Sequence, residues 1–520
     1  MIRFSDVTFT YADADLPVLS GVDLEIPAGE MWLVAGGTGS GKTSFLSAIN
    51  GLVPHFTGGT LEGSVEVDGR STALHPPSAF ADLIGYVGQS PERGFVAERV
   101  EGELAYGLEQ HGVAPTTMRT RVEETLDLLG IASLRDRRLT SLSGGEQQRV
   151  AIGSVLAMHP SVLVLDEPTS ALDPAAAEEV LAILTRLVHD LGMTVVLAEH
   201  RLERVVQYAD RMVLLGPDGR VESGSASAVL ATAPLVPPVI ELSRLLGWDP
   251  PALTVREARR RAADVELHPA PPGPSRSPEH AVAAATRLTV SYGPTVAVRH
   301  VDLEFARGEV SVVMGRNGSG KSSLFWVLSG TMEPATGSVE VAGTVRLVPQ
   351  NPGDLLYLPT VAAECRQADL DARRAPGSCR SILDVLVPGV ADESHPNDLS
   401  EGQRLALVLA IQLLAEPDLL LLDEPTRGLD YRAKAALAGV VRRLADEGRS
   451  VVLSTHDVEF AAIAGDRVVV MAQGEVVADD TARAVLTATP LFAPQITRVF
   501  APTQVLAVAE VASAATRAAP

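Results

Sequence analysis

Several residue types are scarce in this chain of 520 residues, and each scarcity limits what the protein can be. Its two cysteines, Cys365 and Cys379, are too few for a disulfide scaffold, and without a second pair nearby they do not predict a zinc site. No apolar run is long enough to cross a bilayer, since even Leu419–Leu422 ends at Asp423. No signal peptide is visible at the N-terminus. We therefore expect a cytoplasmic chain whose thiols are reduced and incidental.

Basic residues are also in deficit. The chain has 43 lysines and arginines against 65 acidic residues, a formal charge of -22, which argues against sequence-independent binding of nucleic acid. Lysine occurs only as Lys42, Lys321 and Lys434, and the first two lie in glycine-rich loops. In a chain that otherwise uses arginine, this indicates that the two loops need a compact ammonium group. Hydrophobic residues, at 46%, suffice for more than one packed core.

Three motifs occur twice along the chain. The pairs are Gly36–Thr43 with Gly315–Ser322, Leu142–Gly145 with Leu399–Gly402, and Val164–Thr169 with Leu421–Thr426. Repeats of this length predict two domains rather than the units of a solenoid. The second copy is shorter between its glycine loop and Gln350, which predicts a trimmed β-region.

Apolar runs precede the glycine loops and the Asp-Glu pairs, as in strands buried on both faces of a parallel sheet, and helical patterns alternate with them. The sequence therefore predicts an α/β fold, written twice. The expected segments are a first domain at 1–232, its helical C-terminal extension at 233–267, a proline-rich linker at 268–281, a second domain at 282–488 and a C-terminal tail at 489–520.

The glycine-rich loops have the pattern of a phosphate-binding loop, in which backbone N–H groups cradle phosphates and the lysine adds a positive charge. The hydroxyl of Thr43 or Ser322 is then a ligand for Mg²⁺. The predicted ATP-binding residues of these two loops are Gly36, Gly37, Thr38, Gly39, Ser40, Gly41, Lys42, Thr43 and Ser44, and Gly315, Arg316, Asn317, Gly318, Ser319, Gly320, Lys321, Ser322 and Ser323.

Each copy also ends an apolar run with two carboxylates. Asp166 and Asp423 are placed to hold the magnesium ion, and Glu167 and Glu424 follow them, where a carboxylate can direct a water at the γ-phosphate. Together with the loops, these residues predict a magnesium-dependent nucleoside triphosphatase.

The segment Leu142–Arg149, which reads LSGGEQQR, resembles the signature of ATP-binding cassette (ABC) ATPases. The resemblance implies tandem P-loop domains, each with a mostly parallel sheet, a peripheral antiparallel β-region and a helical subdomain. It implies that Tyr11 and Tyr292 stack on adenine, and that Gln89 and Gln350 form Q-loops that act in catalysis and metal binding. It further implies switch histidines at His200 and His456. The signature residues that would contact ATP are Ser143, Gly144, Gly145, Ser400 and Gly402.

In such a pair of cassettes, the signature of each copy completes the ATP site of the other. Site one would then join Lys42 to Ser400, and site two would join Lys321 to Ser143. The second signature departs from the pattern, because Glu401 replaces a glycine and Leu-Ala stands where Gln-Arg is usual. A carboxylate near the γ-phosphate repels it unless turned away, so we expect site one to be the slower site.

Three segments resemble the Q-loop and switch regions of energy-coupling factor (ECF) importers, namely Gln89–Glu92, Phe95–Gly107 and Glu199–Glu203. The resemblance implies an ATPase on the inner face of the cell membrane that drives uptake of a vitamin or a transition-metal cation. Its partners would be a transmembrane coupling protein and a small substrate-capturing membrane protein.

Three other functions are known for paired cassettes of this kind, and the sequence fits each of them less well. A fused sugar-importer ATPase has a similar length, but its Q-loop region should resemble the ECF pattern less closely. A ribosome-associated tandem cassette usually carries a long charged linker, and the charge of -22 counts against ribosomal RNA. A DNA-repair cassette ATPase would need inserted zinc modules, for which two cysteines are too few.

Overall fold

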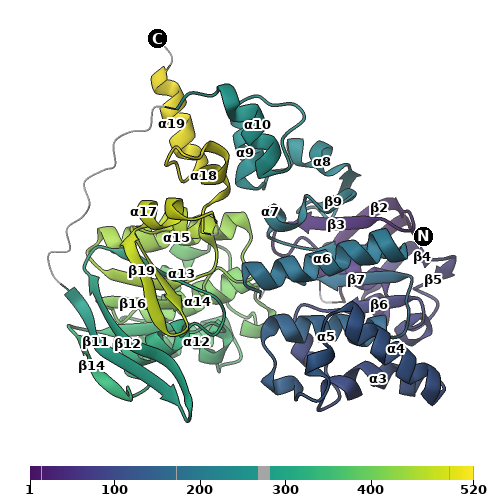
Figure 1. Cartoon of the computed structure of the whole chain (residues 1–520), viewed down its shortest axis with the longest axis horizontal. Helices are drawn as coiled ribbons and strands as arrows, with labels where there is room; N and C mark the ends of the chain where they lie inside the picture. The colour runs from purple at the N-terminus through teal and green to yellow at the C-terminus, as the bar shows by residue number, and fades with distance from the viewer. Residues whose placement is uncertain (13, 171, 268–280, 491, 519–520) are drawn as a thin grey trace. The chain divides into compact units, whose positions relative to one another are not determined.

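The computed structural model describes residues 1–12, 14–170, 172–267, 281–490 and 492–518. The chain separates into two units, Met1–Thr254 and Val255–Pro520 (Figure 1). No helix in the described residues is long and apolar enough to cross a membrane.

The first unit is built on a six-stranded sheet in the order β10-β9-β3-β8-β7-β6. Its strands are β3 (Met31–Gly36), β6 (Ile84–Val87), β7 (Val162–Asp166), β8 (Thr194–Ala198), β9 (Arg211–Leu215) and β10 (Val221–Gly224). All are parallel except β10, which pairs antiparallel with β9. A four-stranded antiparallel sheet, β2-β1-β4-β5, is formed by β1 (Ile2–Thr10), β2 (Leu19–Ile26), β4 (Thr60–Val67) and β5 (Arg70–Ser71).

Helices cover the first sheet and extend beyond it. Their bounds are α1 (Lys42–Ile49), α2 (Leu52–His55), α3 (Val100–Gln110), α4 (Pro115–Leu128), α5 (Gly144–Leu156), α6 (Pro174–Leu191), α7 (Leu202–Val205), α8 (Ala226–Thr232) and α9 (Pro238–Leu245). Helices α3, α4 and α5 pack on one another as a helical subdomain (Figure 1). Trp32, Val164 and Val196 share one face of the sheet, where they pack against Phe45 of α1. Strands covered on both faces are apolar throughout, as the sequence indicates.

The second unit repeats this plan. Its main sheet, in the order β15-β16-β17-β13-β18-β19, contains β13 (Val310–Met314), β15 (Val345–Val348), β16 (Leu419–Asp423), β17 (Ser450–Ser454), β18 (Arg467–Ala472) and β19 (Glu475–Thr481). The peripheral sheet has three strands, β11 (Ala281–Tyr292), β12 (Thr295–Ala306) and β14 (Thr336–Val341), in the order β12-β11-β14. The described residues of this unit hold no counterpart of β5, so the shorter second copy has the smaller β-region.

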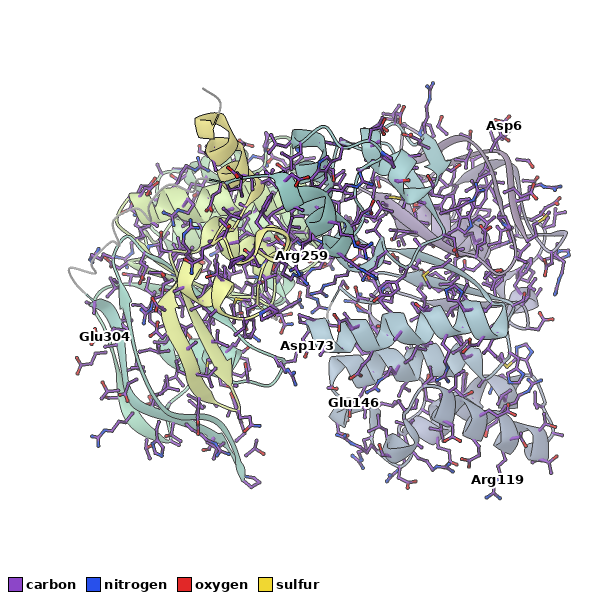
Figure 2. The ribbon with its side chains drawn as sticks, turned by 45° about the horizontal axis from the view of Figure 1, so that its top comes forward. Asp6, Arg119, Glu146, Asp173, Arg259 and Glu304 are labelled. Atoms are coloured by element: carbon purple, nitrogen blue, oxygen red, sulfur yellow. The ribbon has the colours of Figure 1, made fainter. Side chains whose placement is uncertain are left out.

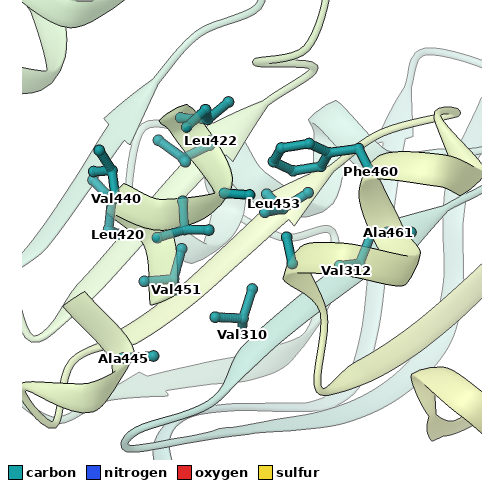
Figure 3. Packing of buried hydrophobic residues seen from close by; sticks show 14 of the residues in the cluster. Val310, Val312, Leu420, Leu422, Val440, Ala445, Val451, Leu453, Phe460 and Ala461 are labelled. Carbon is teal, nitrogen blue, oxygen red and sulfur yellow. The ribbon is translucent and has the colours of Figure 1, made fainter. Parts of the chain in front are cut away.

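The helices of the second unit are α10 (Val255–Arg261), α11 (Lys321–Leu328), α12 (Val361–Asp371), α13 (Ser378–Leu386), α14 (Glu401–Leu413), α15 (Tyr431–Asp446), α16 (Val458–Ala464), α17 (Ala482–Ala488), α18 (Gln495–Phe500) and α19 (Val508–Ala518). Helices α12, α13 and α14 form its helical subdomain. Figure 3 shows the core on one face of the sheet, where Val312, Leu422 and Leu453 pack around Phe460. The neighbouring residues Val313, Leu421 and Val452 face the opposite core. This period-two alternation confirms the predicted α/β class in both copies.

The repeat extends to backbone conformation. Non-glycine residues in the left-handed region occur at matching positions of the two copies, such as His159 with Glu416 and Glu167 with Glu424. Such conformations are costly and sparse, so their recurrence indicates that the same local geometry is required twice.

Two expected segments look different in the structure. The extension expected at 233–267 is divided, because α9 belongs to the first unit whereas α10 packs against α18 in the second. The tail expected at 489–520 carries α18 and α19, and Val511 of α19 is fully buried. The linker expected at 268–281 lies outside the described residues, except for its last residue, Ala281.

Candidate nucleotide-binding sites

Each glycine-rich loop joins a buried strand to a helix that begins at the lysine. Gly41 stands before α1 with a φ of 95°, and a Cβ there would lie 2.9 Å from the carbonyl oxygen of Val18, so only glycine fits. The Nζ of Lys42 donates to the carbonyl oxygens of Gly36 and Gly37 at 3.0 and 3.1 Å. The loop therefore curls around the ammonium group.

The second loop has the same geometry. Lys321 Nζ donates to the carbonyl oxygens of Gly315 and Arg316 at 2.9 and 3.3 Å. In the described part of the chain, the buried hydroxyls of Ser40 and Ser319, at equivalent loop positions, have no hydrogen-bond partner. Buried hydroxyls without a partner are costly, so both loops present polar atoms that a phosphate would satisfy.

The residues predicted to hold Mg²⁺ lie together. Thr43 Oγ1 donates to Asp166 Oδ2 at 2.8 Å, and Ser322 is a hydrogen-bond partner of Asp423. Burial raises the pKa of both aspartates, against the hydrogen bonds from these hydroxyls. One hydroxyl and one carboxylate per site fit a cation that takes its remaining ligands from phosphate and water, as Mg²⁺ does.

Glu167 follows β7 in the left-handed conformation, at φ 51°. Its Oε1 lies 2.7 Å from Nε2 of His200, and its Oε2 accepts from Nε2 of Gln89 at 3.1 Å. Burial opposes ionisation of Glu167, but the hydrogen bond and charge of His200, the charge of Lys42 and the bond from Gln89 outweigh it and lower its pKa. The structure thus brings the predicted glutamate, switch histidine and Q-loop glutamine together.

The second copy differs in detail. His456 Nδ1 lies 2.9 Å from Glu424 Oε2, and Lys321 Nζ lies 3.6 Å from Glu424 Oε1. Gln350 is exposed and, in the described part of the chain, forms no hydrogen bond with Glu424. The Q-loop contact seen in the first copy is therefore missing here, and Lys321 approaches the carboxylate instead.

The tyrosines predicted to stack on adenine occupy matching places. Tyr11 Oη lies 2.7 Å from Ser44 Oγ in α1, and Tyr292 Oη donates to Ser323 Oγ in α11 at 3.2 Å. Tyr292 is 40% exposed. Both hydroxyls anchor their tyrosine beside the phosphate loop.

The two signature serines cap helices. Ser143 and Glu146 form a capping box at the start of α5, and Ser400 and Gln403 form one at the start of α14. Glu146 is labelled in Figure 2, as is Asp173, which caps α6 by accepting from the N–H of Ala176 at 3.0 Å. Gly144 and Gly145 open α5, whereas Glu401 and Gly402 open α14.

Two residues beside the sites, Ser454 and Glu199, were not predicted as site residues from the sequence. Ser454 donates to Asp423 Oδ1 at 2.5 Å and accepts from the N–H of Glu424 at 2.8 Å. Glu199 accepts from the N–H and the hydroxyl of Thr169, both at 2.7 Å. Position-by-position comparison of the two copies is the signal that singles them out, since Ser454 stands where the first copy has Ala198.

Fold and site define a tandem P-loop ATPase. The "ABC transporter" family profile matches residues 19–170 and 298–427. A Streptomyces avermitilis protein, provisionally named an ABC transporter ATP-binding protein, is 54% identical over 99% of this chain and 100% of its own. One from Methanosarcina mazei with the same name is 34% identical over 93% and 89%. The chain belongs to the ABC transporter family, binds ATP and is an ATPase.

Among solved structures, the chain is similar to one titled "Model of ribosome-bound archaeal Pelota and ABCE1". The TM-score is 0.67 at 22% identity, covering 94% of this chain and 80% of that one. At this identity the likeness shows the fold, a tandem arrangement of two cassettes, and nothing of the partners.

Proposed function

We propose that this chain is the ATP-hydrolysing subunit of a membrane importer of the ECF type, and that it powers uptake of a vitamin or a transition-metal cation. The proposal places it on the cytoplasmic face of the membrane, bound to a transmembrane coupling protein and a small substrate-capturing membrane protein. ATP binding would close the two cassettes on each other, and hydrolysis would let them reopen.

Within each cassette, the residues have separate tasks. Mg²⁺, held by Thr43 and Asp166 or by Ser322 and Asp423, would neutralise charge on the phosphates. The loop amides and Lys42 or Lys321 bind the phosphates. Glu167 or Glu424, each beside its switch histidine, orients the attacking water.

The observation that supports the membrane assignment is an exposed side chain after the Q-loop glutamine of each copy. Val96 is 61% exposed and Tyr357 is 80% exposed, at equivalent places in the two copies. The N–H of Val96 donates to the buried Glu103 of α3 at 2.9 Å, and the N–H of Tyr357 donates to the buried Glu364 of α12. In each copy this backbone bond ties the loop to the helix that follows it, so the exposed side chain lies at a defined place where a membrane partner could dock.

ATP hydrolysis is tested with the P-loop lysines. Replacing Lys42 and Lys321 together by Ala should abolish ATP binding and turnover, because the phosphates of the ATP in each site lose the ammonium group that binds them. Equilibrium binding of a fluorescent ATP analogue and phosphate release measure the two effects. Unchanged binding in the double variant would refute the assignment of both sites.

The partner is tested by photo-crosslinking from Val96 and Tyr357 in membranes of the source cells. Leu191, 59% exposed, and Leu370, 72% exposed, are matched control positions for the two. We expect crosslinks to a multi-span membrane protein from Val96 and Tyr357 but not from the controls. Crosslinks to ribosomal protein, with co-sedimentation of the chain with ribosomes, would overturn the importer assignment.

The mutual completion of the sites is tested by non-additivity. Ser143→Ala should cost little further activity in a Glu424→Gln background, because both residues serve site two. In a Glu167→Gln background, the same change should remove most of what remains. Equal effects in both backgrounds would contradict the sandwich.

A further inference from the structure

Lys434 is the one lysine of the chain outside the glycine-rich loops, and it is buried. It lies in the first turn of α15. Asp430 caps this helix by accepting from the N–H of Ala433 at 2.8 Å. Lys434 Nζ lies 2.7 Å from Asp457 Oδ2, and the two side chains are 9% and 3% exposed. A buried charge is retained only with a partner, so each of the two depends on the other.

Asp457 directly follows the switch histidine, His456. Its Oδ1 accepts from the N–H of Phe460 at 3.1 Å and so caps α16, and its own N–H donates to Thr455 Oγ1 at 3.1 Å. One aspartate therefore holds both sides of the short loop that carries His456. The Nδ1 of that histidine lies 2.9 Å from Glu424.

The first copy lacks both members of this pair. It has Ala177 where Lys434 stands and Arg201 where Asp457 stands. Glu199 ties its switch loop to Thr169 through two hydrogen bonds, and at the equivalent positions of the second copy the hydroxyls of Thr455 and Thr426 lie 2.9 Å apart. Because the lysine and the aspartate are both present in one copy and both absent from the other, they form a unit particular to the second cassette.

We propose that Lys434 is a positioning residue of the second ATP site, which acts through Asp457 to hold His456 against Glu424. This inference rests on the proposed catalytic roles of those two residues. Without the pair, the loop gains alternative conformations, and His456 spends less time at Glu424.

The test uses the full chain in a Glu167→Gln background, so that turnover reports the site of Glu424. The variants are Lys434→Met, Asp457→Asn, which keeps a capping side chain for α16, and the double variant. Arg442→Met is the matched control, because Arg442 lies in the same helix, pairs with Asp466 at 2.7 Å and donates to the carbonyl oxygen of Ala464, at the end of α16 that is farther from His456 in the sequence. We expect Lys434→Met to lower kcat roughly tenfold, as loss of an outer-shell partner does, with KM for ATP unchanged.

The double variant should be more thermally stable than either single variant, because no buried charge is left without a partner, but its kcat should stay as low as that of Lys434→Met, because the pair is still absent. Arg442→Met should retain kcat. A Lys434→Met variant that loses thermal stability but keeps its kcat would overturn the proposal, since the pair would then be structural only.

Hydrogen exchange gives a readout independent of activity. In Lys434→Met, the peptide spanning 455–464 should exchange faster, and the equivalent peptide at 199–205 in the same molecule should not change. Equal exchange in wild type and variant would overturn the proposal. Absence of turnover in the parent protein would count against the proposed function instead, and the exchange comparison would still decide the role of Lys434.

Discussion

The carboxylate of Glu401 and the guanidinium of Arg404 form an ion pair 3.1 Å long in the first turn of α14. Arg404 is itself held by the carbonyl oxygens of Pro396, at 3.2 Å, and Leu399, at 3.0 Å. The stem of Glu401 lies against Gly428, where a Cβ would meet Glu401 Cγ at 3.0 Å. The acidic residue that interrupts the second signature is thus fixed and partly neutralised within its own cassette.

The first prediction concerns this pair. Arg404→Gln introduces the residue that the first signature has at this position, Gln147, and leaves Glu401 without its cation. ATP turnover should fall about threefold or more, because an unpaired carboxylate repels phosphate more strongly. Glu401→Gly with Arg404→Gln should restore or exceed wild-type turnover. An Arg404→Gln variant with unchanged phosphate release would contradict this account.

A second prediction follows for the two catalytic glutamates. In the proposed sandwich, the signature with Glu401 serves the site of Glu167, which should be the slower one. Glu167→Gln should therefore remove less of the ATPase activity than Glu424→Gln. The Glu424→Gln variant should lose more than about half of the wild-type activity. Steady-state turnover at saturating ATP measures both. Equal losses would refute the asymmetry.

Much of the site could be predicted because the motifs are local and chemically specific. The pairing of Thr43 with Asp166 follows from where a phosphate loop and a strand end must lie, whereas the contact of Tyr11 with Ser44 was not predicted. Patterns of this kind fix which residues meet. They do not fix the backbone conformation. The left-handed φ angles of Glu167 and Glu424 could therefore be learned only from the structure.

The rest depends on contacts between distant segments that carry no motif. Lys434 and Asp457 belong to different elements, and neither has a recognisable pattern around it. Gln350 has the expected sequence position, yet it does not reach Glu424, whereas Gln89 bonds to Glu167 in the equivalent place. Equal motifs thus predict equal chemistry more reliably than equal side-chain contacts.

A third prediction concerns Glu199, which is 1% exposed and whose Oε2 has no partner in the described residues. Burial raises its pKa, against the hydrogen bonds from Thr169. A raised carboxyl pKa favours the folded state below the unfolded value, and this contribution is lost as pH rises through the folded value. Glu199→Gln cannot ionise and so avoids this loss of stability at high pH. A gain of about 1 kcal/mol in its free energy of unfolding would raise its Tm above that of wild type at pH 8 by about 2–4 °C.

The control for Glu199 is the same comparison at pH 5. There the Glu199 carboxyl of the wild type regains its proton, so the difference in Tm between the variant and the wild type should shrink. Thermal unfolding of both proteins across this range measures it. A variant less stable than wild type at pH 8 would show that Glu199 is ionised and favourable in the folded protein.

The last prediction concerns the two cysteines, which the fold brings together. Cys365 in α12 is 3% exposed, Cys379 in α13 is fully buried, and the two thiols are hydrogen-bond partners. The bond to Cys365, followed by burial, raises the pKa of Cys379, whereas the bond from Cys379 lowers the pKa of Cys365. The thiolate is the reactive form, so in the folded protein, where this bond is intact, Cys365 should react before Cys379. Native protein should label slowly with an aromatic disulfide reagent and take up two equivalents once unfolded. Cys365→Ser should remove the earlier phase, and rapid labelling of both thiols in the native protein would contradict their burial.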